Sequence, residues 1–166
     1  MRRLHSVSPP EGLPKLWERF SPEVVLAEWN GALPSRMLER AAALAIQLRT
    51  HRADPAVLVH GDLVPSNVLI RPDGSVVIID PIGFVGMRAR DLAQMAVATA
   101  GRDRRLNLDD LLKGYGERPP FIDEVFAWLV FMFLEKNIEL ERAHPHTRAT
   151  FVLELSSLAE TFVANA

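Results

Sequence analysis

Residues 57–83 read VLVHGDLVPSNVLIRPDGSVVIIDPIG, and the expected fold class depends mainly on this segment. It contains three short runs rich in Val, Ile and Leu, at residues 57–59, 67–71 and 76–80, whose length and composition predict β-strands. The second and third runs are joined by the tetrapeptide PDGS of residues 72–75, which is typical of a hairpin turn. The stretch therefore predicts a small β cluster that contains one hairpin.

Three side chains with oxygen atoms occupy the ends of these predicted strands. Asp62 lies in the loop after the first strand, Asn67 opens the second, and Asp80 ends the third. Because a hairpin returns to where it began, we expect the three side chains to meet at one edge. Such oxygen ligands suit Mg²⁺ that is shared with phosphates, and an Asp beside it can take a proton from a hydroxyl group. One acidic loop residue is more often a turn residue, but the ordered set indicates a metal–phosphate site.

Helical patterns flank the β cluster on both sides. Residues 1–20 are rich in Pro and Gly and predict loops. Helices are predicted at residues 22–30, 35–52, 91–100, 108–115, 121–142 and 145–163. Helices, a small β cluster and more helices make a mostly helical α+β fold the expected class.

Composition limits the chemistry that the chain can perform. The 166 residues include no Cys, which excludes disulfides, a thiolate nucleophile and Cys-based metal sites. A net charge of −2 argues against a general nucleic-acid binder, and the apolar run at residues 125–134 is too short for a bilayer, which needs about 20 residues. No apolar segment follows Arg2 and Arg3, so a signal peptide is not expected. We expect a cytoplasmic protein with no membrane segment.

The motifs resemble those of a known family. The pattern HGDL followed by NVL, then IIDPIGFVG and the RDLA of residues 90–93, is similar to the aminoglycoside phosphotransferase family. Asp80-Pro81 further resembles the streptomycin and hydroxyurea kinase branch. The resemblance implies a protein-kinase-like C-terminal lobe. It also implies transfer of the γ-phosphate of ATP, with Mg²⁺, to a hydroxyl group of a small-molecule antibiotic.

The resemblance also implies roles for individual residues. Asp62 matches the catalytic base, and Asn67 and Asp80 match the Mg²⁺ ligands. His60 and Asp91 match residues that support the loop structurally. The chain departs from the pattern at residue 64, where many members carry a polar or aromatic side chain and this one has Val.

The elements that grip the nucleotide in kinases are missing from the pattern. None of the nine glycines forms GxGxxG, and Lys15, within GLPKLW, is the only lysine before the catalytic loop. The cofactor-binding residues are therefore unknown. We expect residues 1–166 to form a single C-terminal lobe without the N-terminal nucleotide lobe. A second chain or a homodimer could then cover the surface that this lobe would occupy.

Two other functions are compatible with the residues. The chain could be a non-catalytic kinase-like remnant that acts as a dimerising binding module. A metal-dependent phosphoesterase ranks last, because His60 would be its only nitrogen ligand. From residue 121 onward acidic side chains outnumber basic ones by seven to three. These carboxylates could hold a cationic aminosugar, although solvated helix faces explain them more simply. The sequence does not identify the acceptor.

Overall fold

Helices make up most of the structure, a computed structural model that describes residues 3–29, 35–50, 56–100, 108–115 and 122–143. The helices are η1 (Leu4–Ser6), α1 (Leu16–Arg19), α2 (Pro22–Glu28), α3 (Ser35–Thr50), η2 (Pro65–Asn67), α4 (Arg88–Ala100), α5 (Leu108–Tyr115) and α6 (Ile122–Ala143). The strands are β1 (Val57–Val59), β2 (Val68–Ile70), β3 (Val76–Ile78) and β4 (Phe84–Gly86). The predicted class, α+β and mostly helical, is confirmed.

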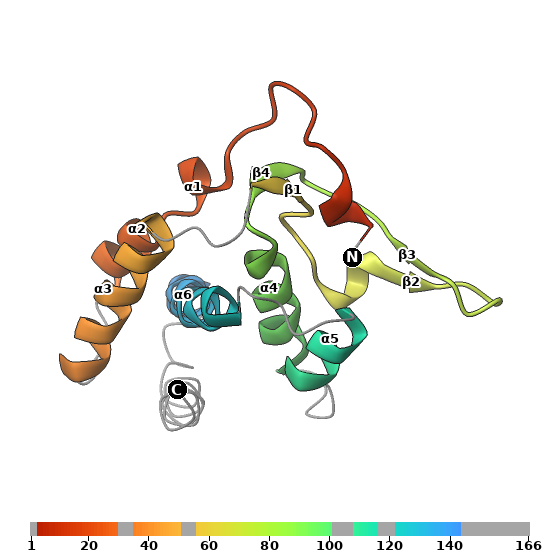
Figure 1. Cartoon of the computed structure of the whole chain (residues 1–166). Helices are drawn as coiled ribbons and strands as arrows, with labels where there is room; N and C mark the ends of the chain where they lie inside the picture. The colour runs from red at the N-terminus through yellow and green to blue at the C-terminus, as the bar shows by residue number, and fades with distance from the viewer. Residues whose placement is uncertain (1–2, 30–34, 51–55, 101–107, 116–121, 144–166) are drawn as a thin grey trace.

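Helix α6 forms the centre of the helical part. It lies between α2 and α3 on one side and α4 on the other, and it contacts all three (Figure 1). Val125, Leu129 and Leu134 on this helix are at most 2% exposed. Full burial of such a side chain contributes about 1.5–3 kcal/mol, so this helix supplies much of the core. The apolar run at residues 125–134 was predicted to be a buried core helix. This is confirmed for every described side chain of the run except Val130, which is partly buried.

The strands form two separate antiparallel pairs. The predicted hairpin is β2 and β3, with Val68 opposite Ile78. It projects away from the helices in Figure 1. Strand β1 pairs instead with β4, with Val59 opposite Phe84. Strand β4 is not predicted from the sequence, because a three-residue strand that ends in glycine carries no alternating pattern.

The segment before α1 docks onto this second pair. Lys15 forms a parallel bridge with Val85, whose backbone N–H donates to the carbonyl of Pro14 at 3.0 Å. A Cβ atom at Gly86 would lie 2.7 Å from Cβ of the fully buried Leu16, so only glycine allows this approach. The prediction of loops over residues 1–20 was therefore incomplete, since η1 and α1 form there.

Element boundaries differ modestly from the predictions. Helix α4 begins at Arg88, three residues before the predicted start, whereas α5 has the predicted bounds. The helix expected at residues 145–163 lies outside the described residues. Among the helices that the structure describes, none is long and apolar enough to cross a membrane.

Candidate active site

The loop after β1 is anchored by one buried carboxylate at the start of α4. Asp91 is completely buried, and its Oδ2 and Oδ1 accept hydrogen bonds from the backbone N–H groups of His60 at 2.7 Å and Gly61 at 3.0 Å. Hydrogen bonds to a charged acceptor are stronger than neutral ones. Asp91 therefore fixes the first turn of the loop that leads to Asp62.

A third group reaches the same carboxylate from the N-terminal segment. Nε2 of His5 lies 3.1 Å from Oδ2 of Asp91, and Nδ1 of His5 lies 3.0 Å from the hydroxyl of Tyr115. His5 is 4% exposed, so the contact is buried. This contact of His5 is not predictable from the sequence, because its partners are 86 and 110 positions away and no local pattern indicates such a contact.

The His60 side chain joins the loop to the end of the hairpin. Its Nδ1 accepts a hydrogen bond from the backbone N–H of Asp62 at 3.3 Å, so Nε2 carries the proton and donates to the carbonyl of Ile79 at 2.9 Å. His60 is 1% exposed. These contacts are those of a residue that organises the loop.

Gly61 has a backbone conformation that the loop requires. Its φ angle is +82°, and a Cβ atom there would lie 2.6 Å from Cε2 of Phe84. Both the left-handed conformation and the aromatic ring behind it favour glycine. The ring of Phe84 thus defines how closely β4 approaches the loop.

Two side-chain amides hold the carboxylate of Asp62. Nδ2 of Asn67 donates to Oδ2 of Asp62 at 3.2 Å and to its backbone carbonyl at 2.9 Å. Nε2 of Gln94 donates to Oδ1 at 3.1 Å. Since Asn67 uses its nitrogen for both bonds, its side-chain oxygen is the atom that could ligate a cation.

Asp80 comes directly after Ile79, the residue at the end of the hairpin that contacts the loop carrying Asp62. The backbone N–H of Ile79 donates to the carbonyl of Asn67 at 2.9 Å, and Ile79 also accepts from His60. The structure thus brings the backbone of Asp80 beside the loop. Within the described part of the chain the Asp80 carboxylate makes no hydrogen bond, and the residue is exposed. Its carboxylate therefore faces solvent and is free of protein donors there.

The backbone of Asp80 is strained. Its φ angle of +54° lies in the left-handed region, where Asp80 is the only non-glycine among the described residues. This conformation costs about 1–2 kcal/mol for a residue with a Cβ atom, somewhat less for Asp. Such strain persists where the surrounding structure imposes it, and it is common at functional sites.

A matched pair of variants measures this strain. We expect Asp80→Gly to have a free energy of unfolding about 1 kcal/mol higher than Asp80→Ala, because only glycine adopts this φ angle without cost. Both variants lack the carboxylate, so the difference between them isolates the backbone. Urea unfolding measures it, and equal stability of the two variants would show that the turn is not strained.

The side chains of Asn67 and Asp80 suit Mg²⁺ better than they suit a metal ion that takes all its ligands from the protein. No cluster of three or more His, Cys, Asp or Glu side chains able to hold a metal occurs among the residues that the structure describes. Magnesium keeps several waters and is usually held by one or two carboxylates together with substrate phosphates. The side-chain oxygens of Asn67 and Asp80 are hard ligands of this kind.

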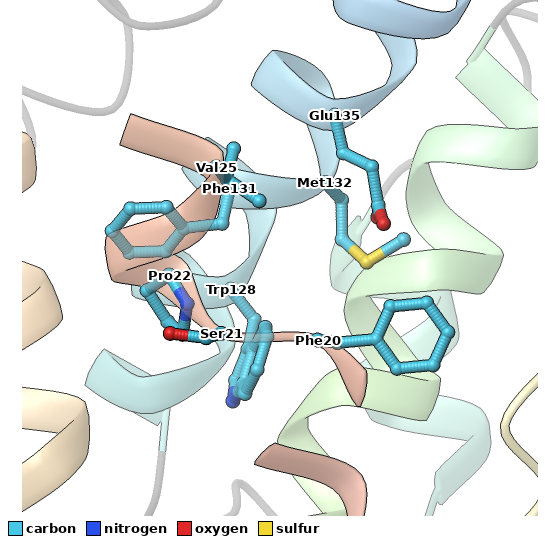
Figure 2. A pocket seen from close by; sticks show the side chains of 8 residues that line it. All are labelled: Phe20, Ser21, Pro22, Val25, Trp128, Phe131, Met132 and Glu135. Atoms are coloured by element: carbon cyan, nitrogen blue, oxygen red, sulfur yellow. The ribbon is translucent and has the colours of Figure 1, made fainter. Parts of the chain in front are cut away.

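A small pocket lies between α6, α2 and the connection from α1 to α2, which contains Phe20 (Figure 2). Its lining includes the aromatic rings of Phe20, Trp128 and Phe131, with the Glu135 carboxylate at one side. Only about 10 Å³ is open to the centre of a water-sized sphere, which is room for one water molecule. The acidic Glu139 in the next turn is paired with Lys136 at 2.9 Å on an exposed face.

Burial raises the pKa of Glu135 above its ordinary 4.5, although the nearby Arg90 guanidinium acts in the opposite direction. A carboxyl group with a raised pKa binds more protons in the folded than in the unfolded state. Its contribution to stability is therefore present below pH 4.5 and is lost as the pH rises through the folded-state pKa.

We expect Glu135→Gln to flatten this part of the pH dependence of stability. The free energy of unfolding of the wild type should fall more than that of the variant as the pH is raised from 4.5. Urea unfolding at several pH values tests this. Glu39→Gln, which makes the same chemical change at an exposed position of α3, is the matched control and should follow the wild type.

Comparisons with known proteins found one matching family model and similar solved structures. A family model described as the phosphotransferase enzyme family matches residues 1–129. No curated protein matches the chain. A solved structure of a choline/ethanolamine kinase family protein from Mesorhizobium loti is 17% identical with a TM-score of 0.63. That match covers 94% of this chain and 55% of the other. This structural similarity shows that the chain has a protein-kinase-like fold.

A second solved structure, assigned as a fructosamine-3-kinase from Thermobifida fusca YX-ER1, is 22% identical with a TM-score of 0.45. It is covered over 51% of its length, and this chain over 92%. The chain thus spans about half the length of the solved structures that it matches.

Proposed function

This chain belongs to the phosphotransferase enzyme family, and we propose that it is the catalytic and acceptor-binding lobe of a small-molecule kinase. The kinase would transfer the γ-phosphate of ATP to a hydroxyl group. The observation that carries this proposal is the Asp62 carboxylate, held by two amides in a loop that also presents Asn67 and adjoins Asp80.

In this proposal Asp62 is the catalytic base. The acceptor hydroxyl gives its proton to the Asp62 carboxylate as its oxygen forms a bond to the γ-phosphorus, and the bond from that phosphorus to the oxygen of ADP breaks. The side-chain oxygens of Asn67 and Asp80 would hold Mg²⁺. When bound, this ion neutralises the charge on the nucleotide phosphates. The strained backbone of Asp80 supports a functional role for that residue.

His60 and Asp91 act on the reaction only through the loop. Both side chains are buried, and both bond to backbone groups of the loop or of the hairpin end beside it. They would keep Asp62 at the right distance from the acceptor. A misplacement of about 1 Å in such a site can cost a hundredfold in rate.

We propose that the acceptor is an aminoglycoside or hydroxyurea-type antibiotic, because Asp80-Pro81 resembles the streptomycin and hydroxyurea kinase branch of the family. The reaction would take place in the cytoplasm, where ATP is available. The nucleotide would be bound by a segment outside these 166 residues or by a second chain. Exposed apolar side chains on and beside the hairpin support such a cover: Leu69, Ile70, Val76 and Ile82 are 48–76% exposed.

Phosphotransfer assays test the function. The 166-residue chain, and the longest polypeptide encoded in frame with it, are incubated with ATP and MgCl₂ plus streptomycin, hydroxyurea, choline or ethanolamine. We expect acceptor-dependent ADP release and a phosphorylated acceptor from the longer polypeptide. Turnover by the 166 residues alone would overturn the proposal that the lobe is incomplete. No turnover in any form would overturn the kinase proposal and favour a binding module.

A further inference from the structure

Gln94 of α4 contacts the Asp62 carboxylate from the side opposite to Asn67. Its Nε2 lies 3.1 Å from Oδ1, whereas Nδ2 of Asn67 lies 3.2 Å from Oδ2. Each carboxylate oxygen therefore accepts one hydrogen bond from a neutral amide. An ionised carboxylate has about four lone-pair sites, so two bonds fix its plane and leave sites for an incoming hydroxyl group.

The orientation of the Gln94 amide is determined by its other contacts. Its Oε1 accepts hydrogen bonds from the backbone N–H of Leu63 at 3.2 Å and from Nη1 of Arg90 at 3.1 Å. Both partners can only donate, so the oxygen must face them. The nitrogen must then face Asp62.

Arg90 is itself held rigidly, one turn before Gln94. It is 1% exposed, its Nη1 also donates to the carbonyl of Gly61 at 3.3 Å, and its guanidinium lies 4.0 Å above the ring of Phe20. A guanidinium over an aromatic face is attracted by the ring. The contacts thus run without a break from Phe20 through Arg90 and Gln94 to Asp62.

We propose that Gln94 is a positioning residue for the catalytic base: its donated hydrogen bond holds the Asp62 side chain in a single rotamer. The proposal rests on the kinase function above. Its alternative is that Gln94 only braces the loop, through the bonds that its oxygen accepts from Leu63 and Arg90.

Two variants separate these roles. Gln94→Glu keeps an oxygen for Leu63 and Arg90 but removes the donor to Asp62 and places a carboxylate there instead. Gln94→Met keeps the approximate volume and removes all three bonds. Gln47→Glu, on α3, makes the same chemical change away from the loop and is the matched control.

The rotamer of Asp62 is measured by NMR from three-bond couplings to its Cγ atom, in the 166-residue chain without nucleotide. We expect couplings of one staggered χ1 rotamer in the wild type and in Gln47→Glu, and averaged couplings in both Gln94 variants. A fixed Asp62 rotamer in a folded Gln94→Glu variant would overturn the proposal. Failure of both Gln94 variants to fold would also overturn it, because Gln94 would then be a structural residue.

Kinetics supply a second readout in whichever form of the protein is active. We expect kcat to fall about 10- to 100-fold in both Gln94 variants, with the KM for the acceptor changed less than twofold. A kcat of Gln94→Glu within twofold of the wild type would contradict a positioning role. If no form transfers phosphate, the kinase function fails, and the NMR couplings still decide whether Gln94 orients Asp62.

Discussion

Asp91→Ala is expected to lower the free energy of unfolding by about 3–5 kcal/mol, the cost typical of removing one partner from a buried, hydrogen-bonded charge. The carboxylate is fully buried and accepts from the backbone of His60 and Gly61, while His5 contacts it from the N-terminal segment. Alanine would leave these groups buried without an acceptor, and each such group carries its own desolvation cost.

Urea unfolding followed by circular dichroism measures this change. Asp73→Ala is the matched control, because Asp73 is an exposed turn residue whose side chain accepts a hydrogen bond from nearby Ser75, and its effect should be small. Asp91→Asn keeps one acceptor oxygen and should lie between alanine and the wild type. If Asp91→Ala were as stable as Asp73→Ala, the buried carboxylate would not anchor the loop.

The second large effect is on the rate of phosphate transfer. Asp62→Asn is expected to lower kcat about 10²- to 10⁴-fold, the usual contribution of a positioned acid or base. The variant keeps the size of the side chain and one oxygen for Asn67 or Gln94. The free energy of unfolding should fall by only about 1 kcal/mol, the contribution of one hydrogen bond.

Acceptor-dependent ADP release measures this rate, in the form of the protein that transfers phosphate. Asp73→Asn changes an exposed carboxylate at the tip of the hairpin and should keep the wild-type rate. A rate for Asp62→Asn within tenfold of the wild type would mean that Asp62 does not act as the base. A large loss of stability in Asp62→Asn would instead assign the residue a structural role.

The elements with strong local signals could be predicted from the sequence. The hairpin followed from the turn at residues 72–75, and α6 followed from an apolar run that its burial confirms. The loop that carries Asp62 and Asn67 could be predicted because the two residues are only five positions apart. Their bond to each other is therefore local in the sequence.

The remaining parts depend on contacts between distant segments. Strand β4 forms because β1 supplies its hydrogen-bond partners from far away in the sequence. Leu58, for example, pairs with Val85, which lies 27 positions later. Gln94 lies 32 positions from Asp62, and a glutamine in a helix looks the same in the sequence whether it faces solvent or a carboxylate. His5 gave no signal for the same reason. The roles of Asp62, Asn67 and Asp80 stay predictions.

The carboxylate of Asp91 also has a consequence for the order in which the chain folds. It receives groups that lie 30, 31 and 86 positions earlier in the chain. The loop that carries Asp62 can reach its final shape only after α4 has docked and His5 has reached the same carboxylate. Contacts of such long sequence separation form slowly. We therefore expect the candidate site to be among the last parts of the molecule to assemble.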